Sequence, residues 1–200
     1  MIEAGSPASR LAGRFNTLPF AVFAAWLSSL LLFWLKALGP LRSFEMAPPE
    51  TAPWPWLAGS AALAASALLL PRAYYLPARF ELGGRLHERL GIRRFRAIMA
   101  NGDLINRFVR RRHTGYVVHS RGSRLERAAV EGFKSERAHL LFMLFGFGTS
   151  GFAFAAGWTG WAAWLGLGNI LVNLYPILLQ RYTRGRIWRI SPDTVRRVLS

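Results

Sequence analysis

The chain contains no cysteine among its 200 residues. Disulfides, thiolate nucleophiles and zinc sites built on sulfur are therefore excluded. Acidic residues are also scarce, because ten Asp and Glu stand against 26 Lys and Arg and leave a formal net charge of +16. A strongly basic chain often binds nucleic acid, but membrane proteins also accumulate Lys and Arg in their cytoplasmic loops. Because 52% of the residues are hydrophobic, we favour the membrane and expect no nucleic-acid partner.

The longest stretch without charge covers residues 138–180, where His139 is the only side chain that ionises near pH 7. About 20 apolar residues cross a bilayer as a helix, so this stretch has room for two helices. The sequence Gly157-Trp158-Thr159-Gly160 lies near its middle and predicts a turn. We therefore predict spans over about residues 139–157 and 160–179.

Two further apolar segments, at about residues 20–38 and 54–71, precede this hairpin. The second is short and rich in Ala, so it either crosses the membrane or enters it only partway. The sequence predicts an all-α membrane protein with about four transmembrane helices and one integral membrane domain over residues 1–200. Three spans plus a re-entrant segment is the alternative.

Basic residues predict the orientation of these helices. Alternate connecting segments hold 24 and 2 of the Lys and Arg residues, and 16 of the 24 lie in residues 72–137. Lys and Arg concentrate on the cytoplasmic side, so we expect both termini and residues 72–137 to be cytoplasmic. Arg10 and Arg14 before the first span also suit a signal peptide. Cleavage would leave an odd number of spans, so we expect a retained anchor.

The segment 72–137 begins with an amphipathic basic stretch. Residues 80–90 place apolar side chains near helical spacing with charges between them, and residues 92–99 repeat the alternation. Helices of this kind lie in the headgroup region of a membrane. We therefore expect anionic lipid headgroups as partners of this segment.

The sharpest group of ionisable residues is Glu131-x-x-Lys134-x-Glu136-x-x-His139, at the entry to the third span. On a helix Glu136 and His139 share a face. A carboxylate beside an imidazole fixes its tautomer and raises its basicity, as a general base requires. These two residues are the predicted catalytic pair, with an ion pair between Glu136 and Arg137 as the alternative. A Glu-x-x-His metal half-site needs carboxylates on partner helices, and the other spans contain none, so we expect no metal.

A second group of polar residues follows the fourth span. Pro176 removes a backbone donor and kinks the helix, and Asn173 is expected to link helices by hydrogen bonds. Arginine presents a planar fork to phosphate or carboxylate. The cluster beyond the span therefore predicts an anion site, with membrane anchoring as the alternative: Gln180, Arg181, Tyr182, Arg184 and Arg186.

From about Phe80 to Arg186 the chain resembles the glycosyl-4,4'-diaponeurosporenoate acyltransferase family of bacterial membrane enzymes. Order and spacing are retained across about a hundred residues. Phe95 and Thr183 stand where the family has Trp and Asn. The matching pieces are Arg94-Phe95-Arg96, Gly102, Leu104, Asn106, Arg112-His113, the series ending at His139, and Pro176 with Gln180-Arg181-Tyr182-x-Arg184-x-Arg186.

The resemblance implies transfer of a fatty acyl group to a sugar hydroxyl of a glycosylated carotenoid or related glycolipid, in the bacterial inner membrane. Acyl-CoA or acyl carrier protein would be the donor substrate, with no bound cofactor. His139, assisted by Glu136, would be the base. The expected substrate-binding residues are Arg181, Arg184, Arg186, Gln180, Tyr182, Asn106, Arg112 and His113.

Two other classes of function remain open from the residues alone. A non-catalytic membrane protein could use the basic segment to bind anionic lipid or an acidic partner, and it would have no use for Glu136 beside His139. A small lipid methyltransferase is a weaker possibility. The sequence contains no glycine-rich phosphate loop and no serine-nucleophile elbow.

Overall fold

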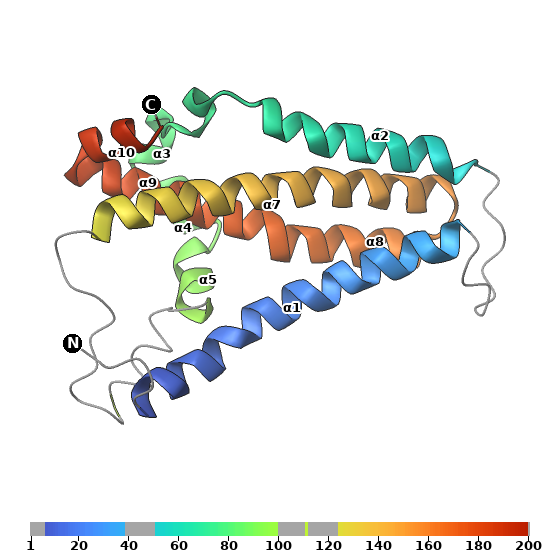
Figure 1. The fold of residues 1–200 in the computed structure, drawn as a ribbon, viewed down its shortest axis with the longest axis horizontal. Helices are drawn as coiled ribbons and strands as arrows, with labels where there is room; N and C mark the ends of the chain where they lie inside the picture. The colour runs from blue at the N-terminus through green and yellow to red at the C-terminus, as the bar shows by residue number, and fades with distance from the viewer. Residues whose placement is uncertain (1–6, 39–50, 100–110, 112–123, 200) are drawn as a thin grey trace. The chain divides into compact units, whose positions relative to one another are not determined.

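The computed structural model describes residues 7–38, 51–99, 111 and 124–199. Within these ranges the chain is helical and contains no strand (Figure 1). The predicted all-α fold is thereby confirmed. The five longest helices among the described residues are α1 (Pro7–Ala37), α2 (Pro53–Ser66), α7 (Arg124–Ala155), α8 (Thr159–Asn169) and α9 (Tyr175–Ile190).

Three helical stretches are long and apolar enough to cross a membrane. They cover Thr17–Ala37, Leu125–Ala155 and Thr159–Ile190. Helix α2 and the short η1 (Ala67–Leu69) give a fourth candidate only when they are taken together with Arg72–Leu82 beyond a break. The structure therefore has three to four candidate spans, in agreement with the predicted fold class.

The chain divides into two compact units. We call residues 23–71 and 135–177 the bundle unit, and residues 1–22, 72–134 and 178–200 the arginine unit.

An aromatic core holds the bundle unit together. The Trp34 ring stacks on Phe152 with a centroid distance of 5.3 Å, and the fully buried Phe33 packs edge-on against Phe152. The indole N–H of Trp34 donates to Thr149 Oγ at 3.0 Å, so its polar atom is satisfied inside the apolar core. This core joins the second half of α1 to α7.

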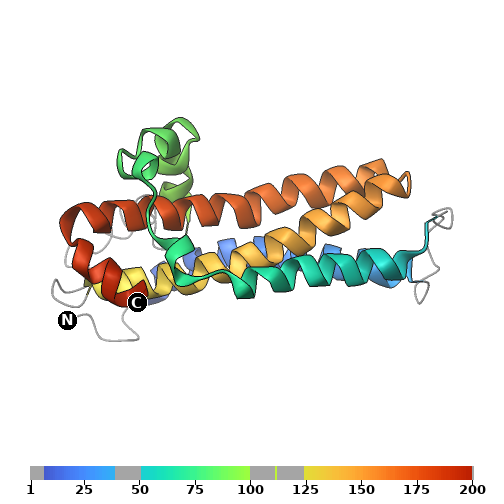
Figure 2. The ribbon, with the colours of Figure 1, turned by 90° about the horizontal axis from the view of Figure 1, so that it is seen from above.

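Two glycines shape the rest of the bundle unit. A Cβ on Gly148 would lie 2.4 Å from Ser60 Oγ, so α7 and α2 approach closely only because this residue is glycine. Gly157 has φ of 75° and ends α7 in the left-handed conformation that glycine adopts without strain. Beyond it the chain returns as α8, and the views agree that α8 runs back beside α7 (Figures 1 and 2).

The arginine unit is built from short helices around the end of α9. These are η2 (Arg72–Tyr75), α3 (Arg79–Leu82), α4 (Arg85–Arg89), α5 (Ile92–Ile98) and the C-terminal α10 (Pro192–Leu199). Helix α10 packs against η2 and buries Val195 and Leu199. The unit's core therefore depends on contacts between segments about one hundred residues apart.

Candidate active site

His139 extends from α7 toward a wide helical turn between α8 and α9. Its Nδ1 atom lies 3.0 Å from Oδ1 of Asn173, which belongs to the π-helical η3 (Ile170–Leu174). The Phe23 ring meets the imidazole edge-on at 5.8 Å. The backbone of Val172 also lies close to the ring. The histidine is half-buried and held on one side by polar groups.

The asparagine chain behind His139 has a fixed direction. Asn169 Nδ2 donates to the carbonyl of Met143 at 2.8 Å, and this carbonyl can only accept. The other amide atom of Asn169, Oδ1, therefore accepts from Asn173 Nδ2 at 2.8 Å. Oδ1 of Asn173 is left to accept from His139, so Nδ1 of the imidazole is the protonated nitrogen. The neutral ring then carries its lone pair on Nε2.

A local break in the helix makes the backbone of this turn available. Pro176 has no N–H and cannot donate to the carbonyl four residues earlier, which is that of Val172. Tyr175 donates instead to Ile170, five residues back, and this bond defines the π-helical turn. Wide turns of this kind are frequent at functional sites. The Val172 backbone thereby contacts His139 rather than closing an ordinary helical turn.

Glu136 lies on α7, one turn before His139, and its side chain is completely buried. From the sequence we predicted that Glu136 orients the imidazole of His139. In the structure Asn173 holds Nδ1 of His139. Glu136 therefore does not hold this nitrogen, and its predicted catalytic role stays a prediction.

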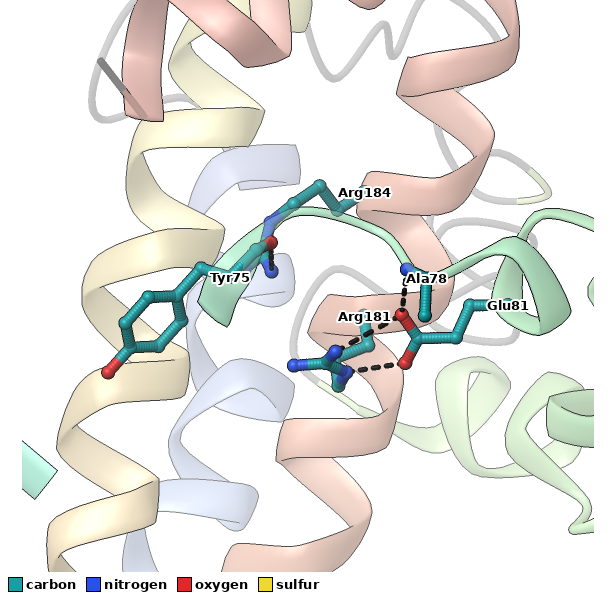
Figure 3. Close-up of polar contacts among 5 residues, drawn as sticks. All are labelled: Tyr75, Ala78, Glu81, Arg181 and Arg184. Carbon is teal, nitrogen blue, oxygen red and sulfur yellow. Dashed lines mark hydrogen bonds and ion pairs between the residues drawn. The ribbon is translucent and has the colours of Figure 1, made fainter. Parts of the chain in front are cut away.

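The arginine unit centres on a buried ion pair that the sequence analysis did not identify (Figure 3). Arg181 donates from Nε to one oxygen of Glu81 at 2.5 Å and from Nη2 to the other at 3.1 Å. Glu81 also accepts from the backbone N–H of Ala78 at 2.8 Å and so caps α3. The Arg181 guanidinium lies over the Tyr74 ring at 5.3 Å. Arg181 is thus engaged inside the protein.

The neighbouring residues of the predicted anion site differ in exposure. Arg184 is 3% exposed and donates to the carbonyl of Tyr75 at 2.6 Å (Figure 3). Tyr182 is buried and its hydroxyl lies 3.2 Å from a carboxylate oxygen of Glu88. Gln180 packs against Gly132. Arg186 is exposed, with its guanidinium 5.9 Å from the Tyr182 ring, and can reach a ligand from solution.

His87 is a second buried histidine, in the arginine unit. It is 1% exposed, and its Nδ1 has no hydrogen-bond partner among the described residues. Burial lowers the pKa of His87, the nearby charge of Glu81 raises it and that of Arg181 lowers it, and the net effect is a pKa below the ordinary value. The ring lies beside that of Tyr182, with 5.7 Å between the two centroids.

Three predicted substrate-binding residues, Asn106, Arg112 and His113, lie outside the described residues. Within the described ranges, no group of three or more His, Asp or Glu side chains gathers as a metal site would require.

The chain matches a known protein family. Residues 71–192 match the glycosyl-4,4'-diaponeurosporenoate acyltransferase family, and this match covers more than half of the chain. The chain belongs to this family. No curated protein and no solved structure matches it.

The acyltransferase family match extends from η2 to the start of α10. It therefore includes His139, Asn173 and both partners of the Glu81–Arg181 ion pair, whereas α1 and α2 lie outside it. The family is named for acyl transfer, as the resemblance implied. Asn169 and Glu81 were not assigned to the site from the sequence. The only indication for either was a polar or acidic side chain within an otherwise apolar or basic segment.

Proposed function

We propose that this membrane protein is an O-acyltransferase that moves a fatty acyl group onto a hydroxyl of a glycosylated carotenoid or related glycolipid. The family match supports acyl transfer, and the candidate spans suit a lipid acceptor. The observation that carries the proposal is the hydrogen-bond chain from the Met143 carbonyl through Asn169 and Asn173 to His139, whose direction makes Nδ1 the donor. With Nδ1 donating to Asn173, Nε2 is left to accept a proton, as a general base must.

The reaction needs one proton acceptor and then one proton donor. His139 Nε2 takes the proton of the acceptor hydroxyl while the oxygen of this hydroxyl attacks the carbonyl carbon of the acyl thioester. The new C–O ester bond forms, the C–S bond breaks, and the imidazolium returns the proton to the leaving thiolate. Glu136 is buried one turn away on α7, and we propose it as the second catalytic residue.

The donor in this proposal is acyl-CoA or acyl carrier protein, both of which carry phosphate. Arg186 is the exposed arginine of the predicted cluster, and its planar fork suits a phosphate oxygen pair. Arg181, Arg184, Gln180 and Tyr182 support this function by holding the arginine unit together. Asn106, Arg112 and His113 complete the proposed substrate-binding set from outside the described residues.

We place the protein in the bacterial inner membrane with both termini in the cytoplasm. The charge distribution supports this orientation, because 24 Lys and Arg residues lie on one set of alternate segments and 2 on the other. Both proposed donors are cytoplasmic molecules, so the orientation and the chemistry agree.

The test is acyl transfer from a labelled donor to a carotenoid glycoside or glycolipid in isolated membranes. Replacing the base, His139→Ala, should lower turnover by roughly two to four orders of magnitude at an unchanged protein level, and added imidazole should restore part of it. Ser150→Ala is the control, because Ser150 lies on the same helix, about three turns beyond His139, and donates to the Ala162 carbonyl. A fully active His139→Ala protein would remove the proposed base. Wild-type membranes that transfer no acyl group would instead favour a non-catalytic, lipid-binding role.

A further inference from the structure

We propose that Asn173 is the positioning residue of His139, with Asn169 holding Asn173 in place. This inference rests on the proposed function, because it assumes that His139 is the base. It assigns to two asparagines the task that the sequence analysis gave to a carboxylate.

The hydrogen bonds alone determine which nitrogen of His139 is free. The chain of donors and acceptors begins at the Met143 carbonyl, which has no donor atom, and runs through Asn169 and Asn173 to the imidazole at distances of 2.8, 2.8 and 3.0 Å. No amide in this chain can rotate without bringing two donors or two acceptors together. The chain therefore excludes the Nε2–H tautomer, in which Nε2 could not accept a proton.

A glycine on α7 makes room for these buried amides in the bundle unit. Asn169 and Asn173 are both completely buried, and buried amides are tolerated only when they are hydrogen-bonded. A Cβ on Gly146 would lie 2.9 Å from Asn169 Cγ and 2.8 Å from the Trp26 ring. The glycine on α7 thus leaves the space that Asn169 occupies.

The wide turn of η3 gives Asn173 its reach toward α7. Tyr175 bonds Ile170 rather than Leu171, and Pro176 donates no bond at all. One extra residue in the turn changes the direction of the side chains that follow it. The same turn presents Val172 and Asn173 together to one imidazole, so backbone and side chain hold the ring jointly.

The decisive variant is Asn173→Leu, which keeps the branched shape of the side chain and removes both amide groups. We expect the turnover number to fall about 100-fold, because a small misplacement of a catalytic group costs about this much, while the donor KM stays unchanged. Asn173→Asp retains the acceptor for Nδ1 but loses the donor to Asn169 Oδ1, so it should recover part of the lost turnover. Nitrogen NMR of histidine-labelled protein should show His139 as Nδ1–H in the wild type and in Asn173→Asp, but not in Asn173→Leu.

Thr149→Val is the matched control. It removes a buried hydrogen bond of 3.0 Å, that from Trp34, in the same unit and away from His139. It should lower thermal stability without changing the turnover number or the tautomer. The proposal is overturned if Asn173→Leu keeps both the Nδ1–H tautomer and the wild-type turnover, or if Thr149→Val reproduces its effects. Absence of acyl transfer in the wild type, with the Nδ1–H tautomer observed, would instead contradict the proposed function.

Discussion

The buried ion pair of the arginine unit gives a prediction whose magnitude follows from its geometry. The Arg181 and Glu81 side chains are 15% and 4% exposed, and two hydrogen bonds join them. Removing one partner of a buried pair leaves an uncompensated charge and costs about 3–5 kcal/mol. In Arg181→Gln the Glu81 carboxylate keeps its bond from the Ala78 N–H, so we expect the lower end, about 3 kcal/mol.

Hydrogen exchange followed by mass spectrometry measures this loss where it occurs. Each 1.4 kcal/mol is a factor of ten in an equilibrium constant, so amides of η2 and α3 should exchange roughly 100-fold faster in Arg181→Gln. Arg186→Gln is the matched control, because Arg186 lies on the same helix and is exposed. An exposed arginine contributes under about 1 kcal/mol, which corresponds to less than about a five-fold change.

The double variant Glu81→Gln with Arg181→Gln separates pairing from packing. If the pair is the source of the loss, removing both charges should cost less than the sum of the two single changes. Equal exchange in Arg181→Gln and Arg186→Gln would refute the reasoning. It would return Arg181 to the surface role in donor binding that the sequence alone suggested.

Two other predictions concern the donor and the membrane. Arg186→Gln should raise the donor KM about ten-fold or more while the turnover number is retained, since one charge-assisted contact contributes about 1.5–3 kcal/mol; an unchanged KM in steady-state assays would leave Arg186 to membrane anchoring. Reporter fusions at Ser200 and in the segment 40–53 should report opposite sides of the membrane, on the 24-to-2 distribution of basic residues, and the same side for both would contradict the topology.

The helical spans could be predicted from sequence because hydrophobicity along one segment decides them. The turn at Gly157 and the break at Pro176 could also be predicted, because each depends on the backbone chemistry of a single residue. The start of α7 was not predicted. This helix begins at Arg124 and has 32 residues, so it runs through charged sequence that an apolar-run criterion excludes.

The partners in the site could not be predicted, because they lie far apart in the chain. The sequence analysis paired His139 with Glu136 because three residues on a helix share a face. Its structural partner, Asn173, is 34 residues away, and Arg181 is 100 residues from Glu81. His139, Asn173 and Arg181 were singled out from the sequence, whereas Glu81 was not. Only the packing of helices decides which of them meet.

The two sites hold their central side chains with different chemistry. In the arginine unit a charged pair, Glu81 and Arg181, is joined by two hydrogen bonds. The histidine of the bundle unit is held by neutral Asn173, which Asn169 holds in turn, and a buried amide costs little once both of its polar groups are bonded. Two asparagines four residues apart, beside a proline-induced wide turn and opposite a histidine, are therefore a pattern worth seeking in other membrane spans.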